Sequence, residues 1–271
     1  MKEAQSVRKA VYAGSFYPDD PATLLDDING YIEESNEDKG VRGSSTVKAI
    51  ISPHAGYIYS GVVAGFAFKS IKKDQFKEVF LLGSAHRLPV TGLGMSTVKY
   101  WETPLGKVRV SDKSRQIVES ESLGIAADES HILDHCLEVQ LPFLQVQLGS
   151  GFEIVPVLVT DIDHVEAASV IDKYYGQDSL LLVSADLSHY LHYDFAVIQD
   201  QTTIESIQKI DSGALLRTGD TCGKIPVAIA LELARSHKWE AVLLDYRNSG
   251  DTAGDKSAVV GYAAFKFVAG L

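Results

Sequence analysis

The chain has 271 residues, 45% of them hydrophobic, so it can bury a substantial core and is not a disordered protein. Its 25 basic and 36 acidic side chains give a formal net charge of −11 with no basic block, which argues against nucleic acid and anionic membrane as partners. Two cysteines, Cys136 and Cys222, cannot form the disulfide framework of a small secreted domain and suit a reducing cytoplasm.

The amino terminus lacks the apolar core of a signal peptide, and no apolar run approaches a membrane span. We therefore expect a cytoplasmic protein that does not contact a membrane. The first predicted helix covers Asp19 to Ile32, where capping residue types and a proline precede apolar residues spaced at three and four. The polar stretch from Ser35 to Thr46, which carries two glycines, predicts a surface loop.

Short apolar runs then alternate with helical patterns. Val47 to Ile51 and Glu78 to Gly83 predict strands, and the helical spacing of Val62 to Ile71 between them implies a right-handed parallel crossover. The same alternation continues with predicted strands at Phe152–Val159, Ser179–Ser184, Ala241–Tyr246 and Ala258–Val268, and with predicted helices at Val165–Tyr175, Phe195–Ile210 and Ile225–His237. The pattern predicts one α/β domain over residues 1–271, with a central, mostly parallel or mixed β-sheet flanked by helices.

Two segments between these strands have a less regular pattern. β-like sequences flank Glu102 to Lys107, which contains Pro and Gly, and predict a hairpin. The segment from His131 to Leu148 predicts one helix with Asp134, His135 and Glu138 on a single face, which Pro142 must bend or divide.

Ionisable residues follow three of the predicted strands. His54 and His86 each come just after a strand, and the pair Asp186 and His189 follows a third. One such histidine could simply be capped or buried in the core. Three at equivalent ends of parallel strands would face one crevice, at the edge where open α/β sheets bind ligands. The coincidence predicts a functional site there.

Other polar residues admit two interpretations. Cys222 precedes a predicted helix, where the helix dipole favours a thiolate that could be a metal ligand or a nucleophile, but a small buried side chain is the alternative. His135 and Glu138 are close enough on a helix to hydrogen-bond beside the site, or they belong to a solvated face. Tyr57 and Tyr59 are either walls of the pocket or core residues.

The sequence resembles the Memo family, also called AmmeMemoRadiSam system protein B. The matching motifs run in family order along nearly the whole chain: Ala13–Pro18, Pro53–Tyr57, Gly83–His86, His135–Pro142, Ser184–His189, Thr221–Gly223 and Val260–Ala263. Two of them depart from the usual family form. The motif Gly83–His86 differs from the usual form, which has Pro then Asn or Ser before the histidine, but the histidine itself is present. Phe16 stands where some members have tryptophan, so a peptide-binding role that depends on that tryptophan does not carry over directly.

The resemblance implies a fold similar to that of class III extradiol dioxygenases, which open aromatic rings at a non-haem iron. It also implies that His54, His86 and Cys222 hold one divalent or redox metal ion, and that Asp186 and His189 complete the pocket as acid, base or substrate anchor. Because a thiolate replaces the usual carboxylate ligand, iron or copper is expected, with zinc as the other candidate.

Two functions follow from the resemblance and the residues. One is redox or oxygen chemistry on an unknown substrate. The other is recognition without turnover, with a peptide or a partner protein in the same pocket. The family name further implies partnership with a radical-SAM protein and a second AmmeMemoRadiSam component.

Overall fold

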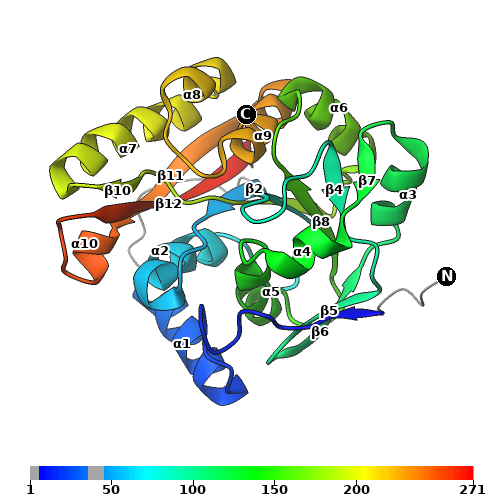
Figure 1. The fold of residues 1–271 in the computed structure, drawn as a ribbon, viewed down its shortest axis with the longest axis horizontal. Coiled ribbons are helices and arrows are strands. Elements are labelled where there is room, and N and C mark those ends of the chain that lie inside the picture. The colour runs from blue at the N-terminus through cyan, green and yellow to red at the C-terminus, as the bar shows by residue number, and fades with distance from the viewer. Residues whose placement is uncertain (1–5, 36–45, 271) are drawn as a thin grey trace.

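Four parallel strands form the centre of the molecule. The computed structural model describes residues 6–35 and 46–270, and within them a mixed twelve-stranded sheet has helices on both faces (Figure 1). The central strands lie in the order β8-β3-β9-β2, and all three neighbouring pairs are parallel. They are β2 (Val47–Ser52), β3 (Glu78–Ser84), β8 (Glu153–Val159) and β9 (Ser179–Ser184). The predicted α/β class with a central mixed sheet is confirmed.

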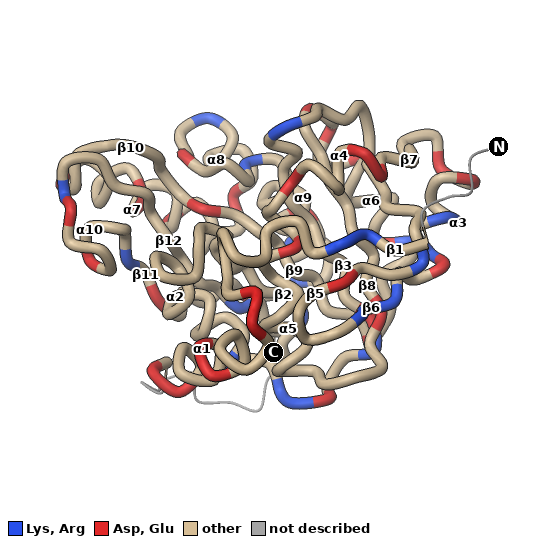
Figure 2. The backbone as a smooth tube through the Cα atoms, turned by 60° about the horizontal axis from the view of Figure 1, so that its bottom comes forward, with Lys and Arg blue, Asp and Glu red and all other residues tan. Residues whose placement is uncertain are grey.

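The composition of these strands explains their position. They contain charged side chains only in their first two residues, so both faces can be buried. Figure 2 accordingly shows most charged positions on the surrounding helices and loops.

Strands of both orientations extend the sheet on its two sides. Next to β2 lies β12 (Val259–Ala269), which also pairs with β11 (Trp239–Asn248) and β10 (His189–Leu191). On the other side, β6 (Gly106–Val110) lies parallel to β8 and forms the predicted hairpin with β5 (Tyr100–Thr103). Three short strands complete the sheet: β1 (Val7–Arg8), β4 (Leu93–Met95) and β7 (Gly124–Ala126).

One face of the sheet packs against α1 (Pro21–Glu34), α2 (Tyr57–Lys69) and α5 (Leu141–Leu148). Helix α1 begins where Asp20 accepts a hydrogen bond from the backbone nitrogen of Thr23, as its capping residues predict. Helices α1 and α2 touch closely, because a Cβ atom at Gly65 would lie 2.4 Å from the carbonyl oxygen of Tyr31. The missing side chain at position 65 therefore permits this helix pair.

The opposite face packs against a second set of helices. They are α3 (Lys113–Ser120), α6 (His164–Tyr174), α7 (Tyr193–Gln208), α8 (Ser212–Thr218) and α9 (Lys224–His237). Helix α6 begins at Asp163, whose carboxylate accepts hydrogen bonds from two free backbone N–H groups of the first turn. A short helix, α10 (Ser249–Thr252), follows β11. No helix in the described part of the chain is long and apolar enough to cross a membrane.

The single helix predicted from His131 to Leu148 is wrong. Helix α4 (Asp128–Leu133) ends before an extended residue, Asp134, and the chain then passes through a 3-10 turn, η1 (Glu138–Gln140), into α5. Pro142 lies in the first turn of α5, where a missing N–H costs nothing, so the division comes ahead of the proline. At the break, the Asp134 carboxylate accepts a hydrogen bond from the backbone nitrogen of His86. The pattern did not predict α3, α8 or the shortest strands, and the loop predicted over Ser35 to Thr46 lies almost wholly outside the described residues.

Candidate metal centre and cavity

The carboxyl ends of three neighbouring strands carry the site. Ser52 of β2 pairs with Ser184 of β9, and Gly83 of β3 pairs with the same residue on the other side. His54, His86 and Asp186 therefore leave the sheet next to one another, each two residues beyond its strand. The sheet edge delivers these side chains to one place.

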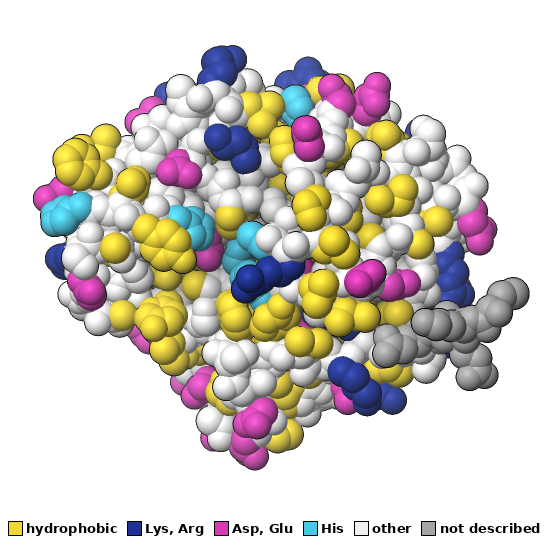
Figure 3. All heavy atoms as spheres, viewed as in Figure 1, with side chains coloured by type: hydrophobic (Ala, Val, Ile, Leu, Met, Phe, Trp, Pro, Cys, Tyr) yellow, Lys and Arg dark blue, Asp and Glu magenta, His cyan; other side chains and the backbone are white. Residues whose placement is uncertain are grey.

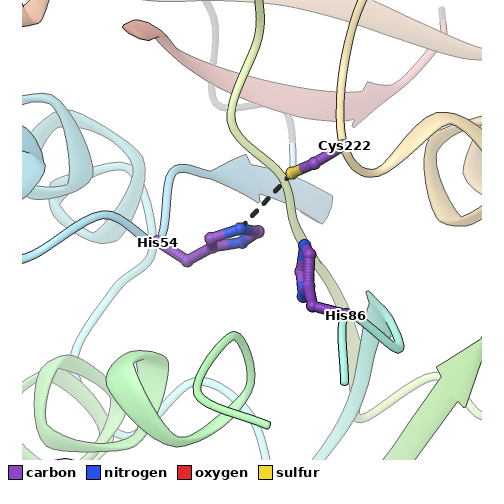
Figure 4. A group of neighbouring side chains, drawn as sticks. All are labelled: His54, His86 and Cys222. Carbon is purple, nitrogen blue, oxygen red and sulfur yellow. Dashed lines mark hydrogen bonds between the residues drawn. The ribbon is translucent and has the colours of Figure 1, made fainter. Parts of the chain in front are cut away.

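Cys222 joins two of these residues. One potential ligand atom from each of His54, His86 and Cys222 lies within 4.8 Å of the others. Figure 4 shows both imidazole rings directed toward the sulfur, and His54 Nε2 lies 3.3 Å from Cys222 Sγ. Gly223 lets the start of α9 approach the end of β9, which brings Cys222 to this position. A Cβ atom at residue 223 would lie only 2.4 Å from Cβ of Ala185, so a larger residue would prevent the approach.

Hydrogen bonds fix the tautomer of His54. Its Nδ1 lies 3.0 Å from Oγ of Ser184, and that hydroxyl donates its own proton to the carbonyl oxygen of Cys136 at 2.6 Å. Nδ1 must then carry the proton of the imidazole, which leaves the lone pair of Nε2 facing Cys222. The backbone nitrogen of His54 donates to Oδ1 of Asp186 at 2.7 Å, which fixes the main chain at the same point.

Asp134 orients His86 in a similar way. Its two oxygens accept hydrogen bonds from Nδ1 of His86 at 3.2 Å and from the backbone nitrogen of His86 at 2.6 Å. Burial opposes ionisation, but these bonds lower the pKa of Asp134 below its usual value. A carboxylate behind an imidazole is a recurrent device that directs the other nitrogen toward a metal. His86 also belongs to a second close group, with Asp134 and Cys136, and its contact with Asp134 there is the hydrogen bond just described.

The local electrostatics favour neutral histidines. Burial, assisted by the neighbouring imidazoles, lowers the pKa of His54 to about 3 and that of His135 to about 4. Both rings are therefore uncharged near neutral pH, and for His54 this is the state in which an imidazole can bind a metal. The thiolate predicted at Cys222 from its place before a helix is not favoured in the metal-free chain, because burial and the nearby Asp186 raise the pKa of the thiol.

An open cavity of about 680 Å³ lies over these residues. Figure 3 shows histidines and a basic side chain around a hollow in this face of the molecule. Four further predicted site residues line the cavity, namely Tyr59, His135, Asp186 and His189. The ring of His135 lies 5.2 Å from the rings of both His54 and His86, measured between centroids.

Two predicted pocket residues lie elsewhere. Tyr57 is buried in the core, where its hydroxyl donates to the carbonyl oxygen of Val139 at 2.7 Å. Glu138 is fully buried and does not bond to His135 as expected; it pairs with Arg8 at 2.5 Å and accepts a hydrogen bond from Tyr17. Neither residue lines the cavity. For Glu138, the break in the helix at Asp134 turns the side chain away from it.

Several residues of the site were not predicted as part of it. Asp134 was predicted only as one of three polar residues on a helix face, and no local pattern distinguishes it. Phe16 lines the cavity with its ring 4.4 Å from that of His135. Three further large side chains of the wall were not predicted, namely Arg87, Tyr190 and Tyr262, and Arg87 could have been suspected from its position next to His86.

Comparison with known proteins identifies the family. The model of the family described as Memo-like protein matches residues 8–266. The chain belongs to the Memo-like family. A MEMO1 family protein of Saccharolobus solfataricus is 34% identical over 96% of this chain and 99% of its own length. Similar proteins occur in Ignicoccus hospitalis, at 36% identity over 96% of this chain and 98% of the relative, and in Aquifex aeolicus, at 34% identity over 97% and 99%. The Memo-like match covers every strand end that carries the site.

Proposed function

We propose that this Memo-like protein binds one metal ion through His54, His86 and Cys222 and uses the cavity above it for redox or oxygen chemistry on a small molecule. The observation that carries the proposal is the convergence of these three ligand atoms within 4.8 Å, two of them from residues that line an open cavity, His54 and His86. The donors fit a metal: the lone pair of His54 Nε2 faces the sulfur, and Asp134 holds the ring of His86 by its other nitrogen.

Two imidazoles and a thiolate suit iron or copper, with zinc as the alternative. Iron or copper would supply electron transfer, and zinc would polarise a bound group. Asp186 is the carboxylate that could complete the set, since its Oδ2 lies 3.9 Å from His54 Nε2. Such a ligand set would resemble that of the class III extradiol dioxygenases. Glu138 is excluded from it by its pairing with Arg8.

His189 is the candidate acid or base. Its Nδ1 lies 2.8 Å from the carbonyl oxygen of Leu187, which can only accept, so Nδ1 carries the proton and Nε2 has a free lone pair. Because His189 lines the cavity, that lone pair is available to take a proton from a bound molecule.

Metal analysis tests the site. Protein purified without a metal-binding tag should contain or take up one equivalent, and Cys222→Ser and His54→Ala should each lose it. Cobalt substitution adds a direct readout, because a cobalt–thiolate bond absorbs in the near ultraviolet, and this absorption should vanish in Cys222→Ser and persist in Cys136→Ser. Cys136→Ser is the matched control, since that thiol is fully buried and lies outside the proposed ligand set. Full metal binding by both ligand variants refutes the assignment.

Recognition without turnover is the second candidate. Exposed aromatic and aliphatic side chains near the cavity, Tyr59 and Tyr190 among them, could contact a peptide or a partner protein. A radical-SAM protein and a second AmmeMemoRadiSam component are the partners that the family name suggests. Oxygen consumption by metal-loaded protein with catechols separates the two functions: sustained turnover that His189→Ala abolishes excludes recognition alone.

A further inference from the structure

Arg87 is an unengaged positive charge at the cavity. It follows His86 directly, its side chain is exposed, and it lines the cavity. Within residues 6–35 and 46–270 its guanidinium has no carboxylate partner and no hydrogen-bond acceptor. Four other arginines in the described part of the chain are paired with carboxylates, namely Arg8, Arg109, Arg235 and Arg247. An arginine left free at the mouth of a cavity is available to a ligand.

No other lysine or arginine in the described part of the chain lines this cavity. Arg87 therefore supplies the fixed positive charge, against one carboxyl group in the lining, that of Asp186. In the metal-free protein, this balance suits a ligand with a single negative charge better than a dianion such as a phosphate ester, which is usually met by several cations.

The rest of the wall is suited to a flat apolar body. Aromatic rings of Phe16, Tyr59, Tyr190 and Tyr262 line it together with small aliphatic side chains. Aromatic walls bind planar molecules through large, rigid contact areas. The cavity volume of about 680 Å³ lies within the range of small-molecule sites.

We propose that the cavity binds a small organic monoanion, a carboxylate attached to an aromatic or similarly flat body, and that Arg87 receives the carboxylate. The inference rests on the proposed use of this cavity as a substrate site and adds the class of substrate. A guanidinium matches a carboxylate with two parallel N–H donors, which an ammonium group cannot reproduce. The ligand would then lie between Arg87 and the histidines, beside the proposed metal position.

The test uses a matched pair of probes, 2-naphthoate and the neutral 2-naphthalenemethanol. Isothermal titration of the full chain, metal-free and metal-loaded, should show that the carboxylate binds more tightly. Arg87→Gln should weaken naphthoate binding by about 10- to 100-fold and leave the neutral probe unchanged, as expected for loss of a charged hydrogen-bonding partner. Arg87→Lys, which keeps the charge but not the paired donors, should fall between. Lys107→Gln is the control, because it removes a charge from a separate cavity, of about 560 Å³.

Three results overturn the inference: equal affinity for the two probes, an unchanged affinity in Arg87→Gln, or no naphthoate binding at about 1 mM. An equal loss in Lys107→Gln places the anion at the other cavity and overturns it as well. A failure of the metal proposal can be distinguished from a failure of this inference. Metal content should be unchanged in Arg87→Gln and lost in Cys222→Ser. The preference for the carboxylate probe is measured in metal-free protein, so it does not depend on whether the protein binds a metal ion.

Discussion

Glu138 is a buried anion that anchors the amino-terminal segment, so its loss should destabilise the fold rather than remove a ligand. The side chain is fully buried and pairs with Arg8, which is itself 2% exposed. The same carboxylate accepts hydrogen bonds from the backbone nitrogens of Val11 and Tyr12, at 3.1 and 2.8 Å, and from the hydroxyl of Tyr17 at 2.6 Å. Four donors thus surround one negative charge.

Glu138→Gln keeps the volume but removes the charge and turns one acceptor into a donor that faces other donors. Breaking a buried ion pair by removing one partner costs about 3–5 kcal/mol. In a domain of this size that corresponds to a lower Tm by roughly 6–20 °C. Glu102→Gln is the matched control, because Glu102 and its partner Lys9 have 30% and 72% of their side chains exposed. Such an exposed pair contributes about 1 kcal/mol or less.

Urea unfolding followed by circular dichroism measures the difference, and metal analysis of the folded variants accompanies it. We expect a lower midpoint for Glu138→Gln, a near wild-type midpoint for Glu102→Gln, and metal binding in both while they are folded. An unchanged midpoint combined with loss of metal or of naphthoate binding would refute the reasoning and return Glu138 to the pocket.

Three further predictions concern the support of the site and the response to pH. Asp134→Asn should weaken metal binding by about 10- to 100-fold in a chelator competition, because the amide cannot accept both bonds from His86; an unchanged affinity contradicts its orienting role. Burial lowers the pKa of His131 to about 4, so an unfolded chain takes up this proton first as the pH falls below 6.5, and stability declines between pH 6.5 and 4. His131→Gln should flatten the decline by up to about 1.4 kcal/mol per pH unit in urea titrations, and equal slopes would exclude it as a cause. Gly223→Ala should destabilise the chain by about 1–3 kcal/mol through contact with Ala185, whereas Gly30→Ala, where a Cβ meets nothing within 4 Å, should be neutral or stabilising.

The sheet edge could be predicted because strand patterns are local. Apolar runs identified the four central strands to within a residue or two, and three of these runs were followed in sequence by a residue of the site. Parallel pairing then placed His54, His86 and Asp186 at one edge without knowledge of the strand order. Cys222 could not be placed in this way, because no strand precedes it. Its approach depends on the contact between Gly223 and Ala185, which only the folded chain defines.

The two carboxylates between α4 and α5 show what a sequence pattern cannot resolve. On a continuous helix Asp134 and Glu138 would be four residues apart and share a face, which is why both were predicted on the same helix face and Glu138 at the pocket. The extended residue at 134 separates them: one carboxylate turns toward His86, and the other toward Arg8. Both still support the cavity, since Asp134 holds a proposed metal ligand and Glu138 anchors the segment that carries Phe16 to the wall. Each role depends on a partner about 50 or more residues away in the chain, a distance over which helical periodicity carries no information.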